Sequence, residues 1–307
     1  MRKEYLYLLI GGLVGAVVVL MFQQKQTPIQ PVPVNVRPAV ASRNNTGLVG
    51  YQPPDQLTFA SERVPLEREH VYERLEREIL VNAFWHSNSI ILLKRANRWL
   101  PTIDSILRAH GIPEDFKYMA VAESGLSNVV SPSKAVGFWQ FLEGTAKDFG
   151  LTVTDEVDQR YDPVASTVAA TKYLKKAYDR FGSWTMVCAS YNMGMNATAR
   201  AIAKQQPGSY YELFLSEEPS RYVFRIIALK CLLEKPDSYG FVVDEIKMYH
   251  KNATIQRTVD QSISDMHSFA SEYGVSYFEL RQLNPWIRDT QLTIRHGQHY
   301  IFNFPVE

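Results

Sequence analysis

The sequence predicts a mainly α protein with an N-terminal transmembrane helix and a small α+β domain at its C-terminus. Three observations support this fold class. Residues 5–22 carry no charge, apolar residues recur at helical spacing from about 64 to 236, and short β-prone pieces surround two helical stretches after residue 240. We therefore expect five segments: a cytoplasmic N-terminus (1–4), a transmembrane anchor (5–22), a proline-rich linker (23–62), a helical domain (63–240) and a C-terminal module (241–307).

The apolar segment 5–22 is long enough to span a membrane. At about 1.5 Å per residue its helix would measure roughly 27 Å, close to the hydrocarbon core of a bilayer. Because Arg2 and Lys3 precede it, we expect the N-terminus in the cytoplasm and the remaining chain across the membrane. A cleaved signal peptide is the alternative, but residues 23–26 (Gln-Gln-Lys-Gln) offer no small-x-small cleavage site. We expect an uncleaved anchor.

The linker 23–62 contains six prolines and no helical period. This composition is typical of an extended tether, partly in the polyproline II conformation, which rises about 3.1 Å per residue. The domain that follows would therefore act at a distance from the bilayer.

The region 63–240 has the pattern of consecutive helices. Val71, Leu75 and Ile79 stand four residues apart, which is the spacing of one helix face. Asp162 followed by Pro163 is typical of an N-cap with proline in the first turn, so we expect a helix to begin there. Further helical patterns cover residues 184–203 and 221–233.

After residue 240 the pattern changes to strand, helix, helix, strand. We expect the first strand within 241–249 (Phe-Val-Val-Asp-Glu-Ile-Lys-Met-Tyr) and the last within 298–305, with two helices between them. Such a βααβ module would have a small core of its own.

Composition excludes several classes of function. With 33 basic and 32 acidic residues the net charge is +1, so no nucleic acid is expected as a partner. The chain has no Walker loop, HExxH or GxGxxG motif, and its seven histidines are scattered, so we expect neither a cofactor nor a metal site.

Cys188 and Cys231 both lie in apolar helical runs. Two separate buried thiols are expected, although an oxidising compartment would permit a bridge.

Glu123 is the unusual residue of the helical domain. It follows Met-Ala-Val-Ala, and Ser124 and Gly125 then end the predicted helix. An apolar setting and the negative end of a helix dipole should both raise its pKa. A carboxyl that stays protonated near neutral pH suits a general acid, whereas the alternative is a solvated glutamate at a helix end.

The motifs that follow Glu123 supply aromatic rings, amides and hydroxyls. They are Gly-Phe-Trp-Gln-Phe at 137–141, Ala-Ser-Tyr-Asn-Met-Gly at 189–194, and Tyr222. One carboxyl with such partners, and no catalytic histidine or metal cluster, is a composition typical of carbohydrate sites.

In this order the motifs resemble those of the soluble lytic transglycosylase (goose-lysozyme-like) family. They are most similar to the membrane-bound lytic murein transglycosylase D group, which has Trp-Gln at the second motif. The resemblance covers residues from about 64 to 236 and implies a lysozyme-like helical catalytic domain.

The C-terminal piece is similar to a LysM module, on the residues Phe269, Ala270, Leu283, Asn284 and Pro285. The usual Gly-Asp-Thr near the start of such a module is absent, so glycan binding and a purely structural role both stay open.

The resemblance makes Glu123 the single catalytic acid and base. It would cleave the β-1,4 bond between N-acetylmuramic acid and N-acetylglucosamine in peptidoglycan, forming 1,6-anhydro-N-acetylmuramic acid during cell-wall remodelling. The substrate-binding residues that it implies are Ser124, Ser131, Gly137, Phe138, Trp139, Gln140, Tyr191, Asn192 and Tyr222. Phe138 and Trp139 could stack on sugar, with one of the two in the core.

Two other functions stay open at this point. One is a lysozyme-type muramidase, which would need a second carboxylate. The other is an inactive protein that binds peptidoglycan. The expected partners are peptidoglycan strands and, through the N-terminal helix, the inner membrane; whether cell-wall synthesis or division proteins recruit the chain stays open. We expect a single-pass membrane protein whose catalytic domain lies in the periplasm, or secretion to the periplasm if the leader is cleaved.

Overall fold

The computed structural model describes residues 50–242, 244 and 247–306. The predicted cytoplasmic N-terminus, the span 5–22 and most of the proline-rich linker lie outside these ranges. Within them, no helix is both long enough and apolar enough to cross a membrane.

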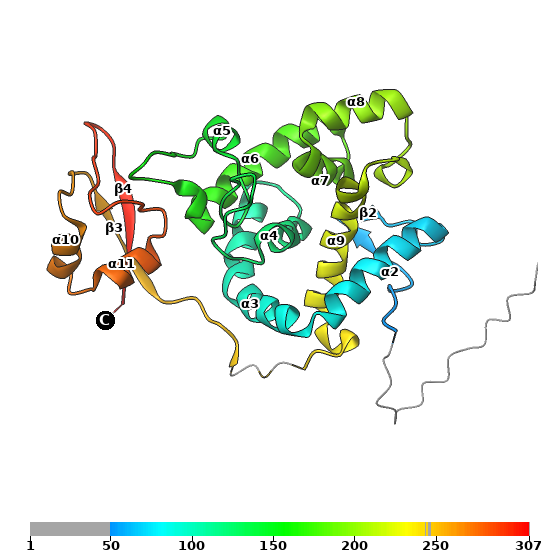
Figure 1. Cartoon of the computed structure of the whole chain (residues 1–307), viewed down its shortest axis with the longest axis horizontal. Helices are drawn as coiled ribbons and strands as arrows, with labels where there is room; N and C mark the ends of the chain where they lie inside the picture. Colours follow the sequence, from blue (N-terminus) through cyan, green and yellow to red (C-terminus); the bar gives the residue numbers. More distant parts are fainter. Residues whose placement is uncertain (1–49, 243, 245–246, 307) are drawn as a thin grey trace, which may run out of the picture. The chain divides into compact units, whose positions relative to one another are not determined.

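Helices dominate the first part of the described chain, as the sequence predicted (Figure 1). The α-helices are α2 (Glu69–Phe84), α3 (His86–Ala109), α4 (Lys117–Ser124), α5 (Glu143–Asp148), α6 (Pro163–Phe181), α7 (Trp184–Met193), α8 (Met195–Gln205) and α9 (Glu217–Glu234). Short 3-10 helices are η1 (Glu114–Phe116), η2 (Gln159–Tyr161), η3 (Tyr210–Glu212) and η4 (Pro236–Tyr239), and a two-strand hairpin, β1 (Thr58–Phe59) and β2 (Glu62–Arg63), precedes α2.

Local signals set the ends of the helices around the site. The Asp162 side chain accepts the N–H groups of Val164 and Ala165 at the start of α6, with Pro163 in the first turn, which confirms the predicted cap. Gly125 ends α4 in the left-handed conformation, with φ of 59°. Since an L side chain would be strained there, glycine makes the stop sharp directly after Glu123 and Ser124.

The helical core places α4 between α3 and α9 (Figure 1). Leu107, Met119 and Phe224, one from each of these helices, are completely buried. Each such side chain contributes about 1.5–3 kcal/mol through burial. The buried carboxylate of Glu78 in α2 accepts from Arg221 Nε of α9 at 2.7 Å, so these two helices are also joined by a polar contact.

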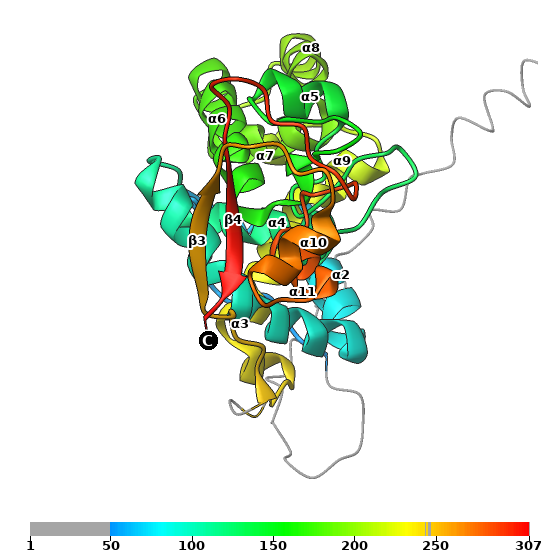
Figure 2. The same ribbon diagram turned by 90° about the vertical axis from the view of Figure 1, so that its left-hand side faces the viewer.

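The C-terminal module consists of β3 (Thr254–Val259), α10 (Met266–Glu272), α11 (Tyr277–Leu283) and β4 (Tyr300–Pro305). The strands are antiparallel over their whole length, from Thr254↔Pro305 to Val259↔Tyr300. Figure 2 shows them side by side next to α10 and α11. Their inner face packs a separate core that includes Met266, Leu280, Trp286, Phe302 and Phe304.

The position predicted for the first strand of the module was wrong. No described residue of 241–249 is in a strand, and the strand that pairs with β4 begins at Thr254. Val259 is the one residue of β3 that is buried. The residues before it are mostly exposed and polar, so the sequence lacks the alternation of apolar and polar residues that predicts a strand. The run 241–249 is more apolar in sequence, but none of its described residues pairs with a strand.

Glu62 of β2 caps α7, the helix that carries Tyr191 and Asn192. Its carboxylate accepts the Thr185 N–H at 3.0 Å and the Thr185 hydroxyl at 2.7 Å, together with the N–H of Trp184 and the hydroxyl of Ser183. A carboxylate at this end of a helix satisfies free N–H groups and complements the dipole.

We expect Glu62→Ala to lower the free energy of unfolding by about 1–3 kcal/mol, because the cap is lost and several donors lose their acceptor. Urea denaturation measures this change. Glu67→Ala is the matched control: Glu67 forms an exposed pair with Arg63, and its removal should change the stability far less. Equal costs for the two variants would contradict the capping role.

Candidate active site

Glu123 lies in the last turn of α4 and is half-buried. The hydroxyl of Tyr222, in the second turn of α9, donates a hydrogen bond to Glu123 Oε1. Ninety-nine residues separate the two positions in the chain, so the packing of α4 against α9 creates the pair.

Burial raises the pKa of the Glu123 carboxyl to about 7. The hydrogen bond from Tyr222 and the positive charge of Arg225 oppose this rise, and the negative charge of Glu218 adds to it. Near neutral pH the carboxyl can therefore both release and accept a proton. A raised pKa is what the sequence predicted for this residue.

Tyr222 remains a hydrogen-bond donor over the whole physiological range of pH. Burial, followed by the negative charge of Glu123, raises the pKa of its phenol well above the ordinary value. The pKa of Tyr191 is raised well above its ordinary value for the same two reasons. Both tyrosines therefore act near Glu123 as neutral hydroxyls.

The segment 128–141 forms a tight loop beside α4. Val136 and Phe141 pair across its turn, and Gly137 lies between them with φ of 79°. A Cβ atom on Gly137 would lie 1.9 Å from the carbonyl oxygen of Arg160, so only glycine fits. The Gln140 side-chain amide donates to the carbonyls of Gly137 (2.8 Å) and Val129 (3.1 Å).

Phe138 and Trp139 of this loop are in the core. Phe138 is 3% exposed and Trp139 is fully buried. Phe138 meets the ring of Trp99 edge-on, and Trp139 Nε1 donates to Thr167 Oγ1 at 2.9 Å. Neither ring presents a free face, so they anchor the loop rather than line a sugar site.

Hydroxyls of the predicted site hold this loop in place. The Ser124 hydroxyl donates to the Phe138 carbonyl at 3.0 Å, and the Tyr191 hydroxyl donates to the Trp139 carbonyl at 2.7 Å. Ser131 Oγ accepts the N–H of Ala135 within the loop itself. Asn192 is exposed one residue beyond Tyr191, in the last turn of α7.

The structure thus joins Glu123, Ser124, Tyr191 and Tyr222 around the 137–141 turn. Sequence reasoning missed the charged residues that adjust the acid, Glu218 and Arg225, which pair with each other at 3.0 and 3.1 Å. The signal for them was their position on α9, four residues before Tyr222 and three after it, on the same helix face.

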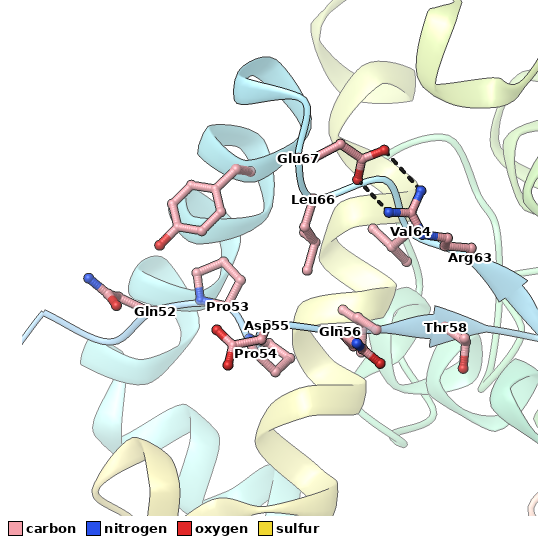
Figure 3. Close-up of a pocket in the computed structure, with 12 residues that line it drawn as sticks. Gln52, Pro53, Pro54, Asp55, Gln56, Thr58, Arg63, Val64, Leu66 and Glu67 are labelled. Atoms are coloured by element: carbon pink, nitrogen blue, oxygen red, sulfur yellow. Dashed lines mark hydrogen bonds and ion pairs between the residues drawn. The ribbon is translucent and has the colours of Figure 1, made fainter.

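Away from Glu123, the structure describes two free cysteines and a pocket, but no metal site among the described residues. In the part of the chain that the structure describes, no group of three His, Cys, Asp or Glu residues could hold a metal ion. Cys188 and Cys231 are free and buried, as predicted. A pocket beside α2 is lined by residues 52–58, 63–64 and 66–67 and Tyr72 (Figure 3), and none of the predicted site residues belongs to it.

Comparison with protein families matches residues 104–214 to the transglycosylase SLT domain. The chain carries an SLT domain. Residues 255–307 match the soluble lytic transglycosylase C-terminal LysM-like domain. Both resemblances inferred from the sequence are confirmed. Glu123, the 137–141 turn and Tyr191 lie within the matched part of the SLT domain, and Tyr222 follows it.

Two curated relatives are lytic transglycosylases. The membrane-bound lytic murein transglycosylases D of Escherichia coli K12 and of E. coli O6:H1 are each 24% identical over 232 residues, 74% of this chain and 50% of the relative. The chain therefore spans about half the length of the curated relatives it matches. An inactive mutant of the lytic transglycosylase Slt from Pseudomonas aeruginosa matches with a TM-score of 0.37 and 18% identity, over 50% of this chain and 26% of that chain. At this TM-score the likeness adds no argument about the fold.

Tyr222→Phe should raise the pKa of Glu123 in the SLT domain from about 7 by roughly one unit or more. The lost hydrogen bond stabilises the carboxylate, so its removal favours the protonated form. NMR titration of the Glu123 side-chain carboxyl measures the midpoint. In the control Tyr191→Phe, whose hydroxyl bonds the Trp139 carbonyl, the midpoint should stay near 7. A lower midpoint in Tyr222→Phe would contradict the assignment.

Gly137→Ala should destabilise the SLT domain more than Gly182→Ala. Both glycines have positive φ, 79° and 64°, and share the cost of about 1–2 kcal/mol for a left-handed residue with a Cβ. Only at Gly137 would the Cβ also clash with backbone. Thermal unfolding of the two variants compares these costs, and an equal loss would show that the contact with Arg160 imposes no constraint.

Proposed function

We propose that the protein is a peptidoglycan lytic transglycosylase in which Glu123 is the single catalytic acid and base. The observation that supports this most is a half-buried carboxyl whose pKa is raised to about 7, hydrogen-bonded by Tyr222 and lying within a domain matched to transglycosylases. A pKa near the working pH is what a group needs if it must first donate a proton and then accept one.

The proposed reaction has two proton transfers. Protonated Glu123 donates to the oxygen of the β-1,4 bond between N-acetylmuramic acid and N-acetylglucosamine, and the bond from C1 to that oxygen breaks. The Glu123 carboxylate then takes the proton from the C6 hydroxyl of the same muramic residue while O6 bonds to C1. The products are a free N-acetylglucosamine 4-hydroxyl and a 1,6-anhydro end. No water is consumed, and Glu123 returns protonated.

A lysozyme-type hydrolase is the less favoured alternative. It usually needs a second carboxylate about 5–9.5 Å from the first. Three of the carboxylates that follow Glu123 in the chain have other partners: Glu143 pairs with Lys147, Glu156 accepts from Thr293, and Asp158 pairs with Arg160. Glu218 is held by Arg225. These bonds leave Glu123 as the carboxyl best suited to the chemistry.

The remaining site residues have supporting roles in this proposal. Gln140 and Asn192 bind the sugar, and Tyr191 and Tyr222 line the cleft at the acid. Ser124, Ser131, Gly137, Phe138 and Trp139 keep the loop in the shape that substrate binding needs, through the contacts described above.

The chain organisation proposed from the sequence completes this function. The span 5–22 anchors the protein in the inner membrane and the proline-rich linker extends from it. The end of the predicted linker 23–62 belongs to the catalytic domain, because Phe59 is buried in its core and Glu62 caps α7. The catalytic domain 63–240 and the LysM-like module 241–307 meet peptidoglycan in the periplasm. Glycan strands are the proposed substrate and partner.

Mass spectrometry of muropeptides released from purified peptidoglycan tests the proposal. The wild-type full chain should release anhydro-muropeptides, one water molecule lighter than hydrolysis products. Glu123→Gln should lower this release at least about a thousandfold, because the proton donor is lost.

The matched control is Glu143→Gln, which removes an exposed carboxyl paired with Lys147 and should keep full activity. Products of full mass would move the assignment to a muramidase. No release by the wild type, with wall binding retained, would favour a binding protein without activity.

A further inference from the structure

The C-terminal module is attached to the catalytic domain at residues 156–158, between α5 and η2. Val157 forms an antiparallel bridge with Ile287, the Asp158 N–H donates to the Trp286 carbonyl, and the Arg288 N–H donates to the Glu156 carbonyl, both at 2.8 Å. Val157 itself is buried in the hydrophobic core of the module. The catalytic domain therefore supplies a residue to the core of the other domain.

Side chains extend this attachment. The Glu156 carboxylate accepts the N–H of Thr293 at 2.7 Å and its hydroxyl at 3.1 Å. The guanidinium of Arg288 lies 4.0 Å from the centre of the Tyr161 ring. Such a short distance is typical of a cation–π contact. The chain segment that leads from η4 to the module is also bound to the catalytic domain: Asn97 and Arg98 of α3 donate to the carbonyls of Tyr249 and His250.

Residues 158–161, which follow directly, hold the 128–141 loop in place. Asp158 forms a buried ion pair with Arg160, at 2.7 and 2.9 Å. The Arg160 guanidinium donates to the carbonyls of Lys134 and Phe141, and its own backbone carbonyl fills the space that a side chain on Gly137 would need. Asn128, at the start of the loop, donates to the Tyr161 carbonyl.

We propose that the LysM-like module is a positioning element of the active site: by holding residues 156–158 it fixes Arg160, and Arg160 fixes the loop that carries Gln140. The module then acts on catalysis directly, apart from any wall binding. The inference rests on the proposed function of this site, because Gln140 must bind the sugar for the position of its loop to matter.

Two variants should weaken the contact between residues 156–158 and the C-terminal module without altering a residue of the catalytic site. Val157→Lys places a charge in the core of the module, which strongly favours separation. Glu156→Ala combined with Arg288→Ala removes the side-chain contacts and leaves both cores intact. Ile301→Ala and Phe278→Ala are matched controls, because these module residues are 50% and 69% exposed.

The first measurement is hydrogen exchange of the full-length chain. The amides of Asp158 and Arg288 should be protected in the wild type and exposed in Val157→Lys, while the amides of β3 and β4 stay protected in both. Exchange of these two amides at the rate of an open chain in the wild type would overturn the attachment, whatever the enzyme's activity.

The second measurement is steady-state kinetics on a short soluble peptide-free glycan, which needs no wall binding. Both opened variants should raise KM about tenfold, because a displaced loop misplaces Gln140. A simple loss of folded enzyme would lower the apparent kcat and leave KM unchanged. Unchanged KM in variants whose attachment is open would overturn the proposal, also if their binding to peptidoglycan falls. No turnover by the wild type would instead refute the proposed function.

Discussion

The hydrogen bond between Tyr222 and Glu123 is the interaction on which the rest of the site depends. Burial raises the pKa of the carboxyl, and the tyrosine hydroxyl limits that rise by stabilising the charged form. A value near 7 results from the balance of the two. Because the partners come from α4 and α9, the packing of these helices determines the protonation of the acid as well as the stability of the core.

The wall of the site beside the acid is built by hydrogen bonds to backbone carbonyls. Ser124 donates to the carbonyl of Phe138, Tyr191 to that of Trp139, and Gln140 to those of Gly137 and Val129. The three aromatic rings of the loop, Phe138, Trp139 and Phe141, are buried. The arrangement leaves little freedom for the backbone of the loop.

The C-terminal module contacts the segment that holds the loop 128–141. Its contact with residues 156–158 combines strand-like backbone pairing with a buried valine, and the neighbouring Asp158–Arg160 ion pair is itself buried. A buried ion pair confers little net stability, but it holds its donors in fixed directions. Here the Arg160 donors point at the carbonyls of Lys134 and Phe141 in the 128–141 loop.

The sequence by itself determined the mainly helical class of the catalytic domain and the Asp162–Pro163 helix start, since these depend on residues close together in the chain. It also predicted the separate thiols and the direction of the Glu123 pKa, but the burial that raises this pKa comes from the packing of distant segments. Only the tertiary structure decided that Phe138 and Trp139 are both buried, that β3 begins at Thr254, and that Glu218, Arg225 and Arg160 act around the acid and its loop. These features depend on contacts between distant segments. No local pattern of apolar or charged residues specifies which carbonyl, ring or strand will be the partner.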